Sequence, residues 1–180
     1  MTDRKQRSPD APLGIPAHGQ ENLLEWLYTL RDHQRASRDK GAWLIKAKNV
    51  PWEHNRQGKM QWYLHPALEN TAIRSMMFFR QEIPPGGRTG AQKTPGDQVI
   101  YVVKGRGYTL LDGVRHDWEA QDVVNIPIRA DGVTMQHFNR SKREPALLAC
   151  VSLNLADILG LDRGSTLEQI EAAPEPGDAL

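Results

Sequence analysis

The chain has 180 residues, which is enough for one domain with a hydrophobic core and short extensions. Its 23 basic and 22 acidic side chains nearly balance, so no one-sided basic field favours nucleic acid as a partner. No apolar run approaches the ~20 residues that cross a bilayer, and residues 1–20 lack the apolar segment of a signal peptide. Cys150 is the single cysteine, which excludes an intrachain disulfide and fits a reducing compartment. These features predict a cytoplasmic protein that binds neither nucleic acid nor membrane.

The N-terminal part of the chain divides into a tail and a helix. Residues 1–20 are rich in proline, glycine and charge, which predicts a disordered tail. Large apolar residues then recur at spacings of three and four, which predicts a helical arm over residues 21–40. The members of this stripe are Leu23, Leu24, Leu27 and Leu30. Docking of the stripe on the body of the protein and docking on a second subunit both remain open.

From residue 41 to residue 153 the chain alternates short β-forming runs with Gly, Pro and Asp turns. The expected strands are 42–45, 61–64, 71–83, 98–103, 108–111, 114–118, 122–126, 133–138 and 146–153. Short strands at this spacing are typical of a sandwich or a barrel, so the fold class is all-β. In the C-terminal extension, residues 154–180, Ser165 or Thr166 is expected to cap a short helix over Leu167–Ala172.

The region from residue 86 to residue 139 resembles the two sequence motifs of the cupin superfamily. The spacing of the first motif is matched without insertion by Gly86, Gln92, Thr94, Gln98 and Gly105. The second motif is matched by Gln121, Pro127, Gly132, Met135 and Asn139, with three extra residues before Gly132. The flanking sequence is similar to small bacterial cupins and to gentisate dioxygenase-like cupins. The resemblance implies a double-stranded β-helix, the cupin or jelly-roll barrel, over residues 41–153 and pairing into a homodimer.

The resemblance also implies where a metal would bind, and here the sequence departs from the family. Two His, a Glu and a later His hold a divalent metal in the family, and those positions are Gln92, Thr94, Gln98 and Met135 in this chain. Amide, hydroxyl and thioether groups are weaker donors than imidazole and carboxylate for Zn²⁺, Fe²⁺ and Mn²⁺. An amide at Gln98 also lacks the negative charge that offsets the charge of a metal. We therefore expect no metal and no cofactor at this site.

His137 is the imidazole nearest to these positions. It follows Met135 by two residues, so on a strand both side chains point to the same face. One hypothesis makes His137 a catalytic acid/base or a hydrogen-bond donor to a ligand. A second makes it an interior histidine bonded to Gln98 or Asn139, and a third has it hold a relocated metal together with His65.

Two arginines extend the predicted binding set. Arg80 on the strand 71–83 and Arg88 at the rim would each suit a substrate carboxylate if they point inward. If they point outward, both are ordinary solvated charges. The complete set of predicted substrate-binding residues is Gln92, Thr94, Gln98, Met135, Arg80 and Arg88.

Three functions are compatible with these residues. The favoured one is a small-molecule-binding cupin with a metal-independent pocket, with acid/base catalysis of isomerase, cyclase or lyase type on a small aromatic or carboxylated compound. The second, implied by the resemblance, is a metal-dependent dioxygenase of aromatic degradation. The third is a non-catalytic ligand-sensing or scaffold cupin. Because one fold hosts unrelated activities, the barrel does not decide whether the protein is an enzyme.

Overall fold

The computed structural model describes residues 22–68, 71–154 and 168–175, and the predicted disordered tail lies outside these ranges. About half of the described chain is β-strand, in line with the predicted all-β class, and one α-helix lies near the N-terminal end. The helices are α1 (Leu23–Asp39) and the 3₁₀ turn η1 (Ala47–Asn49), and the strands are β1 (Glu53–Asn55), β2 (Gly58–Leu64), β3 (Met76–Ile83), β4 (Ala91–Thr94), β5 (Gln98–Lys104), β6 (Arg106–Leu111), β7 (Val114–Glu119), β8 (Val123–Ile126), β9 (Val133–Asn139), β10 (Ala146–Leu153) and β11 (Glu168–Glu171).

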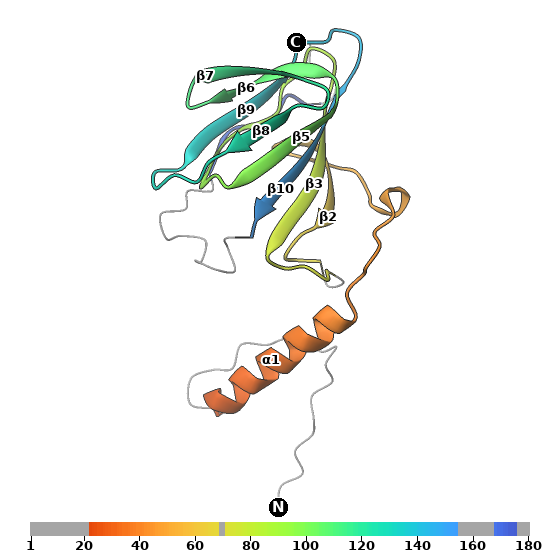
Figure 1. The fold of residues 1–180 in the computed structure, drawn as a ribbon, viewed down its shortest axis with the longest axis vertical. Coiled ribbons are helices and arrows are strands. Elements are labelled where there is room, and N and C mark those ends of the chain that lie inside the picture. Colours follow the sequence, from red (N-terminus) through yellow and green to blue (C-terminus); the bar gives the residue numbers. More distant parts are fainter. Residues whose placement is uncertain (1–21, 69–70, 155–167, 176–180) are drawn as a thin grey trace, which may run out of the picture.

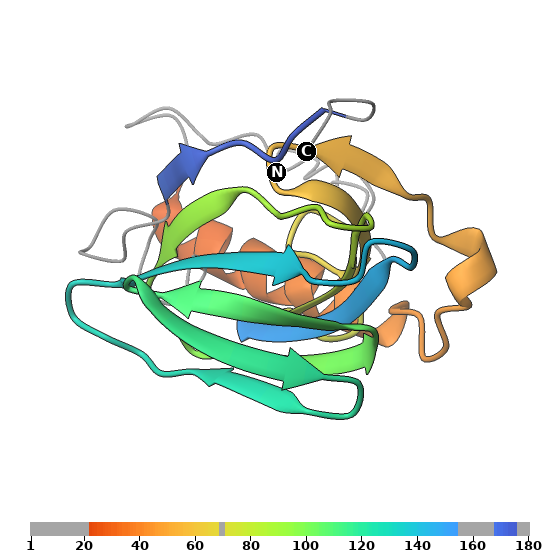
Figure 2. The ribbon, with the colours of Figure 1, turned by 90° about the horizontal axis from the view of Figure 1, so that it is seen from above.

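The strands form two facing antiparallel sheets (Figures 1 and 2). The larger sheet has the order β1-β2-β3-β10-β5-β8, and the smaller has the order β11-β4-β9-β6-β7. Consecutive strands therefore cross repeatedly between the sheets, and strands far apart in sequence, such as β3 and β10, become neighbours. This arrangement confirms the predicted all-β jelly-roll fold.

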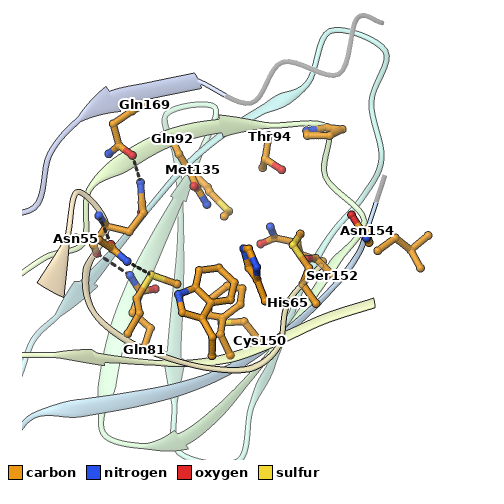
Figure 3. Close-up of a pocket in the computed structure, with 18 of the residues that line it drawn as sticks. Asn55, His65, Gln81, Gln92, Thr94, Met135, Cys150, Ser152, Asn154 and Gln169 are labelled. Carbon is orange, nitrogen blue, oxygen red and sulfur yellow. Dashed lines mark hydrogen bonds between the residues drawn. The ribbon is translucent and has the colours of Figure 1, made fainter. Parts of the chain in front are cut away.

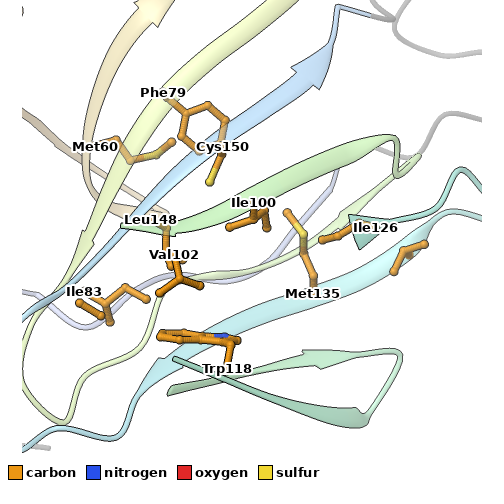
Figure 4. Close-up of a cluster of buried hydrophobic side chains, with 12 residues drawn as sticks. Met60, Phe79, Ile83, Ile100, Val102, Trp118, Ile126, Met135, Leu148 and Cys150 are labelled. Atoms are coloured by element: carbon orange, nitrogen blue, oxygen red, sulfur yellow. The ribbon is translucent and has the colours of Figure 1, made fainter. Parts of the chain in front are cut away.

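Side-chain alternation on the strands builds the core between the sheets. On β5, Gln98, Ile100 and Val102 are buried, whereas the residues between them are exposed, because successive side chains of a strand point to opposite faces. The buried apolar residues gather in one cluster (Figure 4), which consists of Met60, Phe79, Ile83, Ile100, Val102, Trp118, Ile126, Val133, Met135, Ala146, Leu148 and Cys150.

The helix α1 matches the predicted arm and stands apart from the barrel (Figure 1). Its apolar stripe stays exposed, with Leu23, Leu24 and Leu27 each at least half accessible to solvent. Within the described ranges, these three leucines therefore do not pack on the barrel. No helix in the described ranges is long and apolar enough to span a membrane.

Two positions of the motifs serve the backbone rather than a ligand. Gly105 has a φ of +100°, and a Cβ there would lie 2.8 Å from the Cα of Ala146, so only glycine fits between β5 and β6. Asn139 Nδ2 donates hydrogen bonds to the carbonyl oxygens of Ile83, Pro84 and Glu144 at 3.1, 3.1 and 2.8 Å. Asn139 thus joins the end of β9 to two loops, which gives this residue of the second motif a structural role.

Two sequence predictions about secondary structure were wrong. The predicted C-terminal helix is instead the strand β11, which pairs with β4 through Glu168↔Lys93 and Gln169↔Gln92. The open edge of β4 offers unpaired backbone groups, and their pairing outweighs the weak helix propensity of a short segment. The proposed capping residues before it lie outside the described ranges. Residues 42–45 form no strand beyond one isolated bridge, and Trp43 is almost fully exposed.

Candidate functional site

A cavity of about 700 Å³ opens between the two sheets at one end of the barrel. This volume falls within the range of small-molecule sites in proteins, which is about 300–1,000 Å³. One wall comes from β2, β3, β5 and β10 of the larger sheet, and the other from β4, β9 and β11 of the smaller sheet. The cavity is therefore the place where the fold exposes interior side chains to a ligand.

The two walls carry different side chains (Figure 3). The larger sheet contributes Trp62, Met77, Phe79, Gln81, Gln98, Cys150 and Ser152. The smaller sheet contributes Gln92, Thr94, Met135, His137 and Gln169. Thus all four positions of the replaced metal ligands, together with His137, border one cavity, as the sequence predicted for them as a group. The aromatic rings come from the larger sheet, whereas amides and thioethers lie on both walls, and this mixture suits a flat, partly polar molecule.

His137 lies at the end of a chain of buried hydrogen bonds. Its Nδ1 atom lies 2.7 Å from the hydroxyl oxygen of Thr109, and Trp118 Nε1 donates to the same oxygen at 3.0 Å. The backbone N–H of His137 donates to the hydroxyl oxygen of Thr89 at 3.0 Å. Both the ring and the backbone of His137 are consequently fixed, and Nε2 is the ring nitrogen that remains for a ligand.

Burial sets the protonation states of the two titratable groups deepest in the cavity wall. Desolvation lowers the pKa of His137 from 6.5 to about 4, so the imidazole is neutral at pH 7. Desolvation likewise raises the pKa of the Cys150 thiol, which keeps it protonated. Cys150 is thus an unreactive thiol, and His137 acts as an uncharged hydrogen-bonding group.

Two polar groups of the larger sheet are buried without a hydrogen-bond partner among the described residues. They are Gln98 Oε1 and Ser152 Oγ, on side chains that are only 8% and 4% exposed. These residues face each other across neighbouring strands, because Ser152 pairs with Gln98 between β10 and β5. An unpaired buried polar group costs about 1–3 kcal/mol, so a ligand that pairs with these oxygens recovers part of that cost.

Charged groups are confined to the mouth of the cavity. Among its described lining residues the fully charged side chains are Arg56 and Glu168, and both are exposed to solvent. The interior is lined by neutral amides, hydroxyls and apolar groups. A charged ligand group placed deep in the cavity would lose its hydration without gaining an opposite charge.

The residues present do not fit the metal that the fold family commonly holds. The positions corresponding to its ligands supply two amides, a hydroxyl and a thioether, which bind divalent transition metals weakly. Within the described ranges, no three His, Cys, Asp or Glu side chains lie together in a position to hold a metal ion. His65 also borders the cavity, but its ring packs edge-on against Trp62 and its Nδ1 accepts a hydrogen bond from the backbone of Ala67. The donor set therefore suits an organic ligand rather than a metal.

Two residues of the predicted binding set lie outside the cavity. Arg80 points to the outer face of β3, where its guanidinium donates to Gln61 Oε1 and lies over the ring of Trp52. Arg88 forms an ion pair with Glu171 at 2.5 Å near the surface. The alternation of β3 turns Phe79 inward and hence turns Arg80 outward. Neither arginine is placed to clamp a ligand carboxylate inside the barrel.

Several residues of the site were not predicted from the sequence. Phe79 and Gln81 lie on the face of β3 opposite to Arg80, and period-two alternation would have placed them together once the inward face was known. Ser152 similarly alternates with Cys150 on β10. The contact between Thr109 and His137 carries no local signal, because it joins residues that are 28 positions apart.

The fold and the cavity define a class of protein, the small jelly-roll barrels with an internal ligand pocket. Residues 79–152 match the family described as Cupin domain, which supports a place for this region in the cupin superfamily. No curated protein shows significant sequence similarity to this chain.

Solved structures with a similar fold include proteins of different kinds, such as a polyketide cyclase and a vicilin. The polyketide cyclase RemF from Streptomyces resistomycificus superposes with a TM-score of 0.52 at 14% identity, covering 62% of this chain and 79% of its own. Vicilin from Capsicum annuum gives a TM-score of 0.51 at 15% identity, covering 62% of this chain and 31% of its own. At such identities the similarity shows the fold alone.

Proposed function

We propose that this cupin binds a small aromatic molecule in a metal-independent pocket between its two sheets. The observation that supports the proposal is the cavity itself, in which neutral His137 and unpaired Gln98 stand among aromatic and thioether side chains. Of the aromatic and carboxylated compounds expected from the sequence, the uncharged interior favours the aromatic ones. We also propose that the pocket binds this molecule without a metal or another cofactor.

His137 is the residue that we propose for catalysis, if the bound molecule is turned over. A buried neutral imidazole can share a proton with a ligand oxygen, which is the step needed in an isomerisation, cyclisation or elimination. The reaction would thus be of isomerase, cyclase or lyase type. Binding without turnover would instead assign the protein to the ligand-sensing group.

Replacing His137 by Ala should weaken the binding of aromatic ligands about ten-fold or more, because a buried hydrogen bond inside the cavity is lost. Ligands are found by the rise in melting temperature with a set of neutral phenols, aryl ketones and benzoates, and affinities follow from calorimetry. His116→Ala, at an exposed position of β7, is the matched control and should leave affinity unchanged. Equal affinities of wild type and His137→Ala would contradict the assignment.

Treatment with a chelator separates the metal-independent pocket from the dioxygenase alternative. Binding should be the same before and after EDTA, because the proposed contacts come from protein side chains alone. Binding that disappears with EDTA and returns with Fe²⁺ would support a metal-dependent dioxygenase instead.

The expected homodimer is also a proposal, and the outer face of the larger sheet supports it. Val99, Tyr101 and Val103 on β5 and Val123 on β8 are each 41–51% exposed and form a continuous apolar surface. Contiguous exposed apolar surface of this kind is commonly covered by a partner. A second copy of the chain would cover it.

The substitution Tyr101→Glu should convert the dimer to a monomer, because a charge would be buried in the apolar contact. Light scattering after size exclusion measures the mass. Val114→Glu, on exposed β7 of the other sheet, is the control and should stay dimeric. A monomeric wild type at high micromolar concentration would rule out the pairing. The cytoplasmic location expected from the lone cysteine stays a prediction.

A further inference from the structure

We propose that Thr109 and Trp118 are positioning residues that hold His137 in one tautomer, with its proton on Nε2 facing the cavity. The inference rests on the proposed function in that it assigns the hydrogen-bonding direction of the same pocket. It consequently names the ligand class: an uncharged aromatic compound with a carbonyl or similar acceptor at one end and a hydroxyl at the other.

The direction of the hydrogen bonds follows from what each group can donate. An indole N–H is a donor with no acceptor capacity, so Trp118 must give its proton to the Thr109 oxygen. The Thr109 hydroxyl then has one proton left to give, and the acceptor within reach among the described residues is His137 Nδ1 at 2.7 Å. Nδ1 therefore carries a lone pair, and the proton of the neutral ring lies on Nε2.

The opposite tautomer leaves a buried donor unpaired. If Nδ1 carried the proton, the Thr109 oxygen would accept two hydrogen bonds and its own proton would have no partner. Thr109 is fully buried and His137 and Trp118 nearly so, which excludes solvent as that partner. Burial of an unpaired hydroxyl proton is unfavourable. The hydrogen-bond relay from Trp118 through Thr109 to His137 therefore selects the Nε2–H form.

The selected tautomer determines what the ligand must offer. His137 on β9 presents a donor to the cavity, and a ligand carbonyl or ether oxygen is its complement. On the opposite wall, Gln98 Oε1 is a buried acceptor that no group in the described part of the chain pairs with, which calls for a ligand hydroxyl or N–H. Because the charged lining residues are at the mouth, the group that reaches His137 is an uncharged carbonyl rather than a carboxylate.

The tautomer can be measured in the free protein, without any ligand. The two ring nitrogens of a neutral imidazole differ widely in ¹⁵N chemical shift according to which one carries the proton. In uniformly labelled wild type at pH 7, the ring of His137 should show the proton on Nε2. Proton on Nδ1, or a charged ring, would overturn the proposal.

Two substitutions at Thr109 separate a positioning role from simple packing. Thr109→Val keeps the shape but removes the hydroxyl, so the ring nitrogens of His137 should shift towards a mixture of tautomers. Thr109→Ser keeps the hydroxyl and should restore the wild-type pattern. An unchanged tautomer in Thr109→Val would show that the hydroxyl does not select it. If that variant does not fold, Trp118→Phe tests the other end of the relay with the same readout.

The ligand class is tested with matched phenols. 4-Hydroxyacetophenone has both the acceptor and the donor, 4-ethylphenol lacks the carbonyl, and 4-hydroxybenzoate replaces it by a carboxylate. Calorimetry should show the ketone binding about ten-fold more tightly than either. Tighter binding of the benzoate, or binding of none of the three, would reject the ligand class. Neither result affects the tautomer measurement in the free protein. The proposal of an aromatic-ligand pocket and the proposal about the His137 tautomer can therefore fail independently.

Discussion

Acidification from pH 7 to pH 4 is expected to remove about 3 kcal/mol of folding free energy through His137 alone. Burial lowers the pKa of His137 from 6.5 to about 4, so below pH 6.5 the unfolded chain binds a proton that the folded protein does not. The contribution of neutral His137 to the free energy of unfolding is fully present above pH 6.5. It is lost as the pH falls towards the pKa of about 4 that His137 has in the folded protein. Each pH unit in that window is worth about 1.4 kcal/mol.

The measurement is the free energy of unfolding from urea titrations at several pH values between 4 and 7. Carboxylates also contribute to acid sensitivity, so the informative quantity is the difference between variants. His137→Gln should show a flatter profile than wild type, whereas His116→Gln, at an exposed position, should follow wild type. Parallel profiles for wild type and His137→Gln would mean that His137 is not buried in its neutral form.

Truncating Ile100 to Ala should lower the free energy of unfolding by about 2–5 kcal/mol. Ile100 is 1% exposed and lies at the centre of the cluster between the sheets (Figure 4). Loss of three methyl or methylene groups there removes apolar contacts and leaves a void that the two sheets are too firmly paired to close.

The matched control for this change is Ile128→Ala, because Ile128 is the same residue type but 60% exposed in the loop after β8. It should change the free energy of unfolding by no more than about 0.5 kcal/mol. Both variants are compared with wild type by urea denaturation at one protein concentration, since pairing would make stability depend on concentration. Similar losses in the two variants would show that burial at Ile100 does not carry the stability.

The sequence predicted several residues that line the cavity, most of them on the wall formed by the smaller sheet. The spacing of the motif residues indicated that Gln92, Thr94, Gln98 and Met135 share a site, and all four border the cavity. That inference holds because strand alternation is local: residues two apart on a strand share a face wherever the strand is placed. The same rule linked His137 to Met135.

Apart from Gln98, the wall formed by the larger sheet could not be predicted, because alternation does not say which face of a strand is inward. Strand 71–83 was expected to begin earlier than β3 does, and Arg80 was considered as an inward residue, whereas Phe79 and Gln81 occupy that side. A shift of one residue exchanges the two faces, and only pairing of β3 with β2 and β10 fixes it.

The sequence by itself determined the all-β cupin fold, since the fold follows from residue identity and short spacings, whereas the replacement of the metal ligands stays a prediction. Only the tertiary structure decided that the C-terminal segment pairs with β4, that the two arginines lie outside the cavity, and that Thr109 and Trp118 meet at His137. The physical reason is the same for all three. A buried hydrogen bond or an added strand depends on which groups are brought together from distant parts of the chain. Local propensity depends only on neighbouring residues, so it does not predict such contacts.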